Sequence, residues 1–275
     1  LRFTARTLAL PFRWLGYRGD PSLPPTTRAL TALGPAYIKF GQILSTRPDV
    51  VGDALASELR VLQDALPPFS TALAKAEIER ELGIRVDDVF TSFSEPVAAA
   101  SLAQVHKATL RDTGEAVAVK VLRPGIERAF RKDVDAFYLA ASLIETLSPA
   151  SRRLRPLDVI DHFDGVVRGE LDLRLESSAA SEFRSNTERD AGFQVPVVKW
   201  EQSARRVMTL GWAEGVNIGD NAALDAAGHD RAELAARVLQ LFLNHALRDG
   251  LFHGDMHQGN LKVAANGDII AYDFG

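Results

Sequence analysis

Near its C-terminal end the chain reads His253-Gly254-Asp255-Met256-His257-Gln258-Gly259-Asn260, and Asp273-Phe274-Gly275 follows, its Asp273 thirteen residues after Asn260. Phosphoryl transfer needs a carboxylate beside the attacking hydroxyl or water, and oxygen ligands for the magnesium that neutralises the phosphates. Asp255 can supply the first, and Asn260 with Asp273 can supply the second. The segment between them has a suitable length for a hairpin that brings both ligands to one side of a metal. In this order the two motifs predict a phosphoryl-transfer site.

A lysine ends an apolar stretch further upstream, Ala116-Val117-Ala118-Val119-Lys120. An ammonium is costly to bury unless an anion accompanies it. Kinases place such a lysine on their third strand, against the α- and β-phosphates and a helix glutamate. The alternative is an edge-strand lysine that reaches solvent. Because the aspartate and asparagine cluster follows it, we interpret Lys120 as a phosphate-binding residue.

Composition excludes several classes of protein. The 275 residues are 46% apolar and 25% charged, which excludes a disordered or collagen-like chain and allows one large core or two smaller ones. The absence of cysteine excludes disulfides and cysteine-based zinc sites. A net charge of -4 provides no global attraction to nucleic acid or anionic lipid. No apolar run approaches the roughly 18 to 20 residues that span a bilayer. Because the chain begins at Leu1 and stops at Gly275, we expect both ends to be cut from a longer chain.

Periodicity along the chain predicts strands mixed with long helices. We expect helices from near Thr31 and over 70–82, 127–147, 156–185 and 231–249. We expect two strands within 97–110 around a small-residue loop, and further strands over 115–122, 195–199, 206–210, 261–264 and 268–272. This order predicts an α+β two-lobed domain behind a helical extension.

The first nineteen residues are basic and partly apolar, with four arginines and no acid before Asp20. We expect a helix that docks through its Phe and Leu side chains. A basic amphipathic surface helix and the end of an organelle transit peptide are the alternatives.

Taken together, these motifs resemble those of the UbiB-like (ADCK-type) atypical kinases over nearly the whole chain. The segments that carry the resemblance are Tyr37-Ile38-Lys39-Phe40-Gly41-Gln42, Ser45-Thr46-Arg47-Pro48-Asp49, Leu62-Gln63-Asp64 with Pro67-Pro68, Ala98-Ala99-Ala100-Ser101-Leu102-Ala103-Gln104-Val105-His106, Val117-Ala118-Val119-Lys120 with Arg123-Pro124-Gly125-Ile126, Glu170-Leu171-Asp172, and the two C-terminal motifs. The KxGQ segment and the alanine-rich loop are the most specific, because ordinary protein kinases lack the first and have glycines in place of the second.

The resemblance implies an α+β, protein-kinase-like two-lobed fold with an N-terminal helical extension, truncated after the DFG motif. The domains expected from it are a helical extension with the KxGQ motif over 1–90, a kinase-like small lobe with inserted helices over 91–215, and the start of the large lobe with the catalytic loop and metal-binding DFG over 216–275.

Roles for the KxGQ residues also follow from the resemblance. An idealised helix places Tyr37, Phe40 and Leu44 on one face, with Lys39 and Gln42 on the opposite one. In the family this segment enters the active-site cleft, so the resemblance makes Lys39 and Gln42 candidates for a gate that excludes bulky substrates. A solvated polar pair on a surface helix is the alternative.

The alanine-rich loop, Ala98, Ala99, Ala100 and Ser101, takes the place of a glycine-rich phosphate loop. Alanine restricts positive φ and keeps the backbone farther from phosphate, so nucleotide binding should differ from that of a protein kinase. A plain small-residue turn is the alternative.

Three acids, Glu170, Asp172 and Glu176, lie within the helix expected over 156–185. Asp172 and Glu176 share a helix face and should repel unless a cation lies near, with Lys120 and Lys39 as the available cations. The resemblance implies that Glu176 pairs with Lys120, and that Glu170 with Asp172 forms an acidic motif near Lys39. Glu170 as the partner of Lys120 stays open, and so does a solvated acidic face.

The chain departs from the family pattern at four positions. Ser177 and Ala179 stand where Ala and Asn are usual, which weakens the assignment of that helix. Gly254 replaces a frequent Ala and Gln258 a frequent Pro, changes that should alter loop stiffness without removing a ligand.

The resemblance implies an atypical kinase or ATPase that binds Mg2+ and ATP and supports quinone or isoprenoid lipid metabolism. Its expected partners are ATP and a lipid or quinone-precursor small molecule, without nucleic acid. The expected location is peripheral, at the cytoplasmic side of a bacterial membrane or in an organelle. The alternatives are a non-catalytic nucleotide-sensing lipid-binding module and a small-molecule kinase of the aminoglycoside or choline type.

Overall fold

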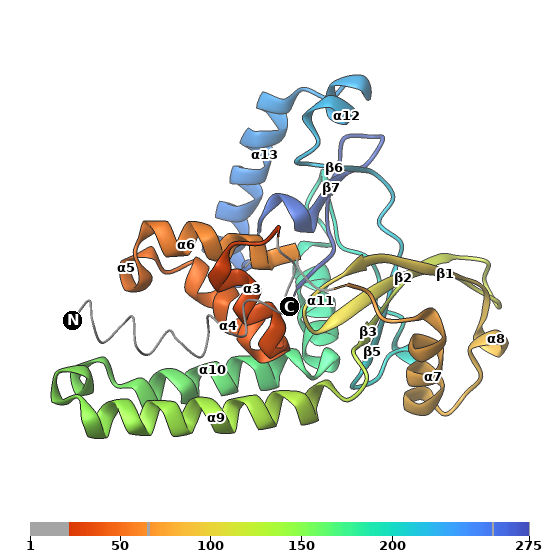
Figure 1. Cartoon of the computed structure of the whole chain (residues 1–275). Helices are drawn as coiled ribbons and strands as arrows, with labels where there is room; N and C mark the ends of the chain where they lie inside the picture. Colours follow the sequence, from red (N-terminus) through yellow and green to blue (C-terminus); the bar gives the residue numbers. More distant parts are fainter. Residues whose placement is uncertain (1–21, 65–66, 255, 275) are drawn as a thin grey trace. The chain divides into compact units, whose positions relative to one another are not determined.

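The computed structural model describes residues 22–64, 67–254 and 256–274 (Figure 1). The basic N-terminal segment, Asp255 and Gly275 lie outside the described residues. Two compact units make up the chain: unit 1 comprises Leu1–Ala74, Ala98–Gln104 and Leu122–Leu171, and unit 2 comprises Lys75–Val97, Val105–Val121 and Asp172–Gly275. None of the helices in the described ranges combines the length and apolarity that crossing a bilayer requires. The domain boundaries expected at residues 90 and 215 stay a prediction.

The helices of unit 1 are α3 (Pro25–Leu33), α4 (Pro35–Ser45), α5 (Pro48–Val51), α6 (Asp53–Leu59), η1 (Arg60–Asp64), α9 (Ile126–Leu147), η2 (Pro149–Leu154) and α10 (Pro156–Glu170). Helices α9 and α10 lie side by side as a long hairpin (Figure 1). The expected helix start near Thr31 was wrong, because α3 begins six residues earlier at Pro25. Proline is tolerated in the first turn of a helix, where its missing N–H leaves no bond unmade.

Helix α4 packs on two sides. On one side the rings of Tyr37 and Phe40 contact Phe137 of α9 at centroid distances of 4.6 and 5.2 Å, and Phe40 also contacts Phe163 of α10 at 5.2 Å. On the other side Ile38 forms a buried cluster with residues of α6 and η1. The helix is therefore held between the hairpin and the short helices that follow it.

Gly41 lets α4 approach those short helices closely. A Cβ at this position would overlap the side chain of Leu62 and lie 3.0 Å from that of Leu30. The glycine of the KxGQ motif is thus explained by packing, because any larger residue forces these leucine side chains to shift.

The remaining helices are α7 (Thr71–Leu82), α8 (Val86–Val89), α11 (Leu173–Thr187), η3 (Trp200–Gln202), α12 (Asn221–Ala226), α13 (Arg231–Asn244), the single π turn η4 (His245–Asp249) and η5 (Gln258–Asn260). One sheet has the order β1 (Phe90–Ala99), β2 (Ala103–Leu110), β3 (Ala116–Leu122), β5 (Val207–Gly211). The second has the order β4 (Phe193–Gln194), β8 (Ile269–Ala271), β7 (Leu261–Val263), β6 (Val216–Asn217).

Three further expectations from periodicity needed correction. The first of the two strands expected within 97–110 is β1, which begins seven residues earlier at Phe90. The single helix expected over 156–185 is two helices, because Asp172 leaves the helical conformation and its side chain caps α11 by accepting a bond from the N–H of Arg174. The strand pair expected between 195–199 and 206–210 forms only in part. Strand β5 pairs along its length with β3, and the earlier segment adds one antiparallel bridge, Val198 to Leu210, with backbone hydrogen bonds of 2.8 and 2.9 Å on either side of it.

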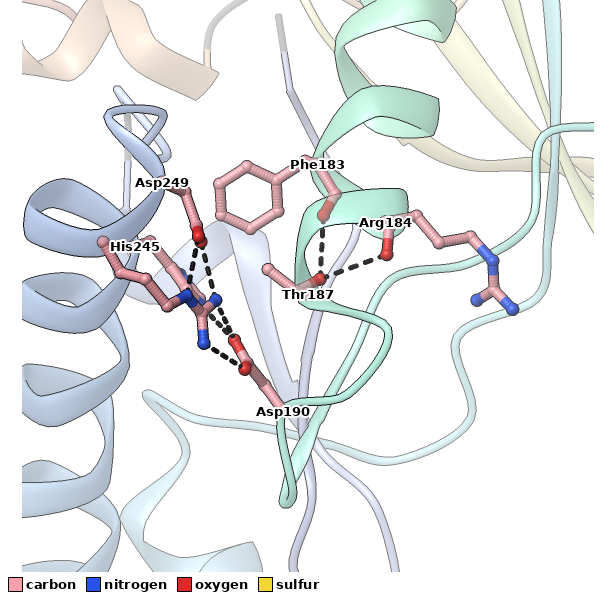
Figure 2. A network of polar contacts seen from close by, with 7 residues as sticks. Phe183, Arg184, Thr187, Asp190, His245 and Asp249 are labelled. Carbon is pink, nitrogen blue, oxygen red and sulfur yellow. Dashed lines mark hydrogen bonds and ion pairs between the residues drawn. The ribbon is translucent and has the colours of Figure 1, made fainter.

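A polar network ties the end of α11 to the helix that follows α13 (Figure 2). The carboxylate of Asp190, just after α11, accepts bonds from the guanidinium of Arg248 at 2.6 and 2.9 Å and lies 3.0 Å from Nε2 of His245. His245 is fully buried, with its ring 5.0 Å from that of Phe183 of α11. Asp190 is only 12% exposed, so its charge depends on these partners.

We expect Asp190→Asn to lower the free energy of unfolding by about 2 kcal/mol at pH 7, because it removes charge-assisted bonds at an almost buried position. The hydrogen bond from Arg248 holds the pKa of Asp190 below its usual value. A lowered folded-state pKa contributes stability above the unfolded pKa, near 3.9, and that contribution is lost as pH falls through the folded value. Urea unfolding at pH 7 and at pH 3 measures the difference, which should shrink at the lower pH.

Asp49→Asn is the matched control. Asp49 accepts a similar forked pair of bonds from Arg47, but its side chain is 62% exposed, so its loss should leave the free energy of unfolding nearly unchanged. Equal effects of the two substitutions would show that Asp190 is an ordinary surface acid.

Candidate active site

The alternation of side chains along β3 determines which face of the strand carries Lys120. Val117, Val119 and Val121 are fully buried, whereas Lys120 lies on the other face of the strand, which is only half-buried. Antiparallel pairing with β5, in which Lys120 is opposite Met208, fixes the position of the lysine along the sheet. The sequence therefore fixes which face of the sheet carries the ammonium.

Two carboxylates surround that ammonium. Nζ of Lys120 donates to Oε1 and Oε2 of Glu176 at 2.7 and 2.9 Å, and to Oδ1 of Asp273 at 3.3 Å. Glu176 is 8% exposed and lies in the first turn of α11. The sequence left open whether Glu170 or Glu176 pairs with Lys120, and the structure pairs it with Glu176.

The electrostatics of the pair keep Lys120 charged. Burial by itself lowers the pKa of Lys120, but the carboxylates of Glu176 and Asp273 outweigh burial and raise that pKa well above its ordinary value. Asp273 is 40% exposed at its side chain, so one of the two acids also reaches solvent. A permanent ammonium beside an accessible carboxylate suits a site for a phosphate group and its metal.

The β7–β8 hairpin positions the two predicted metal ligands. Asn260 ends η5 immediately before β7, and Asp273 follows β8 by two residues. The register pairs Leu261 with Ala271, and the N–H of Tyr272 donates to the carbonyl of Asn260 at 3.2 Å. Asn260 and Asp273 therefore lie at the same end of the hairpin, as the spacing between the motifs predicts.

Asn260 and Asp273 carry the oxygen ligands that Mg2+ prefers. Asn260 offers an amide oxygen and Asp273 a carboxylate, both hard donors, and Mg2+ is commonly held by one or two such groups together with phosphates and waters. Among the described residues, no group of three or more His, Cys, Asp or Glu side chains forms a complete metal site.

Asp255 lies outside the described residues, but the chain on both sides of it is anchored. The ring of His253 is buried and lies 4.9 Å from that of Phe274. On the other side, Nδ1 of His257 accepts the N–H of Gly259 at 2.9 Å. The hydroxyl of Tyr272 donates to the carbonyl of Gly259. These contacts hold both ends of the loop against the DFG segment.

The alanine-rich turn belongs to unit 1. Its four residues, Ala98 to Ser101, span the end of β1 and the turn into β2, none has a positive φ, and Ser101 is buried. The N–H of Ala100 donates to the carbonyl of Ala103 at 2.8 Å. The loop therefore keeps the backbone conformation that alanine allows.

Sequence reasoning missed the two side chains that hold this turn. The guanidinium of Arg123 donates to the carbonyls of Ala100, at 3.2 and 3.3 Å, and of Pro67, at 2.9 Å. The buried amide of Gln104 exchanges two hydrogen bonds with the backbone of Phe69, at 2.9 and 3.1 Å. The sequence signal for these two residues is that Gln104 belongs to the alanine-rich motif and Arg123 to the motif Arg123-Pro124-Gly125-Ile126.

The KxGQ residues also lie in unit 1, and each has its own partner. Nζ of Lys39 lies 2.6 Å from Oε2 of Glu170, and the side-chain amide of Gln42 donates to the carbonyl of Leu62 at 2.9 Å. The alternative of a solvated polar pair is therefore wrong, because the two side chains bind α10 and η1 separately. The expected grouping of Glu170 with Lys39 is confirmed.

The cation beside Asp172 is Arg174, and not Lys39 or Lys120 as expected. Its carboxylate accepts the guanidinium of Arg174 at 2.6 and 2.8 Å in addition to capping α11. The like-charge pair of Asp172 and Glu176 is thus relieved by one cation for each acid, Arg174 and Lys120.

A cavity of about 1160 Å³ in unit 2 is lined by none of the predicted site residues. It is lined by residues of the segment after β5, such as Trp212 and Glu214, together with Phe193 and Arg184. We place the site by its charged groups, because the ammonium and carboxylates gather at Lys120 and not in this hollow.

Comparisons with known proteins agree with this geometry. A family model described as "ABC1 atypical kinase-like domain" matches residues 61–275. A protein of Marinobacter nauticus named "Probable protein kinase UbiB" is 42% identical over 252 residues, which cover 90% of this chain and 46% of that protein. A protein of the same name from Azotobacter vinelandii is 43% identical over 273 residues, 97% of this chain and 51% of that one. The chain thus spans about half the length of these relatives.

A solved structure gives the same result for the fold. The complex of Rv3197 with erythromycin, from Mycobacterium tuberculosis, matches with a TM-score of 0.64 and 27% identity, covering 99% of this chain and 65% of that one. The expected α+β, kinase-like fold is therefore confirmed. The family model covers most of this chain, and Lys120 contacts both Glu176 and Asp273 of the DFG motif. The chain therefore belongs to the ABC1 atypical kinase-like family, the UbiB-like kinases that its motifs resemble.

Proposed function

We propose that this chain is the nucleotide-binding part of an atypical kinase or ATPase that uses Mg2+ and ATP. The contact of Lys120 with both Glu176 and Asp273 is the observation that carries the proposal. In that role Lys120 binds phosphate oxygens, Glu176 holds the ammonium in place, and Asn260 with Asp273 supplies oxygen ligands to magnesium. The ion, when bound, neutralises charge on the phosphates.

Asp255 has the chemical role in this proposal. Its carboxylate accepts the proton of the attacking hydroxyl or water, a role that matters in the transition state and little in the ground state. Every residue type that phosphoryl transfer needs is present, which favours an enzyme over a non-catalytic nucleotide-sensing module.

The pathway and partners are proposed from the relatives' names. UbiB-named relatives at about 40% identity support a role in ubiquinone-type quinone or isoprenoid lipid metabolism. The proposed partners are ATP and a lipid or quinone-precursor small molecule, at the surface of a membrane. Turnover of ATP by the full-length protein, with and without quinone-precursor headgroup analogues and liposomes, tests this part of the proposal.

We expect Asp273→Asn to weaken binding of ATP in the presence of Mg2+ by at least about tenfold, because it removes a charged metal ligand and one carboxylate beside Lys120. Calorimetric titration of full-length protein measures the affinity. Asp268→Asn, which removes an acid from the turn of the same hairpin, is the control and should leave the affinity unchanged. Equal affinity for ATP in magnesium and in chelator would contradict the metal assignment.

We expect Asp255→Asn to reduce turnover by about 100-fold or more while leaving ATP affinity within a factor of two, because proton transfer contributes mainly in the transition state. Steady-state hydrolysis and a binding titration on the same preparation separate the two effects. If hydrolysis continues at the wild-type rate, the protein belongs with the non-catalytic binding modules.

The gate role of Lys39, Gln42, Glu170 and Asp172 and the phosphate-loop role of Ala98 to Ser101 stay proposals. We expect Lys39→Ala to keep ATP affinity and autophosphorylation, since the partner of Lys39 is Glu170. Lys120→Ala should lose both properties.

Ala99→Gly should tighten ATP binding, because glycine gives the turn access to positive φ.

Lys39→Arg, which keeps the charge, is the control for the first variant. Loss of both properties in Lys39→Ala, as in Lys120→Ala, contradicts the gate. Unchanged ATP affinity in Ala99→Gly shows that the alanine segment is only a turn.

A further inference from the structure

The residue that precedes Asp273 in the chain is also bonded to the backbone of the other predicted metal ligand. Tyr272 lies directly after β8, and its side chain is half-buried. Its hydroxyl donates to the carbonyl of Gly259, and its N–H donates to the carbonyl of Asn260 at 3.2 Å. None of the roles proposed above uses the side chain of Tyr272.

The backbone of Asn260 is hydrogen-bonded on both sides of its α-carbon. In the peptide unit before it, the carbonyl of Gly259 accepts from Tyr272, and the N–H of Asn260 donates to the carbonyl of His257 at 3.0 Å. In the peptide unit after it, the carbonyl of Asn260 accepts the N–H of Tyr272. The two peptide planes determine φ and ψ of the residue between them, and so the direction of its Cα–Cβ bond. Tyr272 therefore contributes to the direction of the Asn260 side chain.

Only one of the two bonds from Tyr272 depends on its side chain. A phenylalanine at this position keeps the bond from its N–H to Asn260, because every residue except proline has that donor. It has no hydroxyl for the carbonyl of Gly259. The substitution therefore frees one peptide plane beside the metal ligand and leaves the other bonded.

Gly259 makes that plane dependent on external bonds. Its N–H donates to Nδ1 of His257 at 2.9 Å, and a Cβ on Gly259 would lie 2.5 Å from Cε1 of the same ring. The close approach of the imidazole thus requires glycine, the residue whose backbone its own side chain restricts least. The hydroxyl of Tyr272 supplies one of the bonds that fix the backbone here.

The hydroxyl of Tyr272 is itself held by Asn217 of β6. A carbonyl can only accept, so the single hydroxyl proton goes to Gly259, and the hydrogen bond with Asn217 uses an N–H of its side-chain amide. Oδ1 of Asn217 accepts the N–H of Gly219 at 2.8 Å, which agrees with this orientation of the amide. A chain of hydrogen bonds thus runs from β6 through Tyr272 to the residue before Asn260.

We propose that Tyr272 is a positioning residue that, through the peptide plane between Gly259 and Asn260, orients the side chain of Asn260 as a ligand for Mg2+. This inference rests on the proposed function with Mg2+ and ATP, and it adds to that function a residue outside the motifs. Partners that orient a metal ligand typically change metal affinity by about 10- to 100-fold. The contact of phosphates with Lys120 should not depend on Tyr272.

The experiment compares Tyr272→Phe with the wild type in full-length protein. Calorimetric titration gives the dissociation constant of ATP in chelator and over a series of Mg2+ concentrations. In Tyr272→Phe the Mg2+ concentration that gives half of the gain in ATP affinity should rise about tenfold. The affinity for ATP in chelator should stay within about a factor of two. Without nucleotide or metal, hydrogen exchange should be faster at the amide of Asn260, because its peptide plane has lost one bond.

Tyr138→Phe is the matched control. The hydroxyl of Tyr138 donates to Oδ1 of Asp161 at 2.6 Å, and both residues belong to unit 1, which holds neither of the predicted metal ligands. The control removes the same hydroxyl group and should leave the response to magnesium unchanged. Thermal unfolding checks that both variants are folded.

The outcomes separate this inference from the function on which it rests. If magnesium tightens ATP binding to the wild type but Tyr272→Phe changes the magnesium requirement less than about threefold, the positioning role fails and the proposed function stands. If the affinity for ATP falls equally in magnesium and in chelator, Tyr272 supports the nucleotide site as a whole, and the inference is again overturned. If magnesium has no effect on the wild type, the metal assignment fails, and this inference fails with it.

Discussion

The ion pair between Lys120 and Glu176 is the contact on which the arrangement of unit 2 depends. It joins strand β3 to helix α11, two elements 56 residues apart in sequence, at a position where the glutamate is almost fully buried. Removal of Lys120 leaves the buried carboxylate of Glu176 without its cation, which is far more costly than the loss of a surface pair. The third member, Asp273, connects the β7–β8 hairpin to the same point. Three separate segments of unit 2 thus meet around one ammonium.

Local signals made much of the fold predictable. The helices α7 and α9, the strand β3 and the β7–β8 hairpin lie within one or two residues of their expected ranges, because each has clear periodicity and ends at a glycine or a turn. Gly83 and Gly267, with φ of 69° and 87°, mark two of these ends in the left-handed region. The break at Asp172 was not predictable in this way, since the apolar periodicity of α10 continues into α11 and only one capping aspartate separates them.

The candidate site was predictable to a different degree. The residues with charge, Lys120, Glu176 and Asp273, were identified by motif, and the structure brings them together. The side chains that hold the alanine-rich turn were not, because Arg123 and Gln104 bind backbone groups 23 to 56 residues away, and any residue type can offer a carbonyl. Contacts to backbone leave no complementary partner in the sequence, so only the fold reveals them.

The bonds of Asp190 to His245 and Arg248 fix the C-terminal end of α11. Its far end is fixed to His245 and Arg248, whereas Glu176 lies eleven residues away from Thr187, about 16 Å along the axis at 1.5 Å per residue. A tilt of about 10° around the fixed end displaces Glu176 by about 3 Å, which is enough to break its 2.7 Å contact with Lys120. The distance between Glu176 and Lys120 therefore depends on how the whole of α11 is held as well as on the ion pair itself.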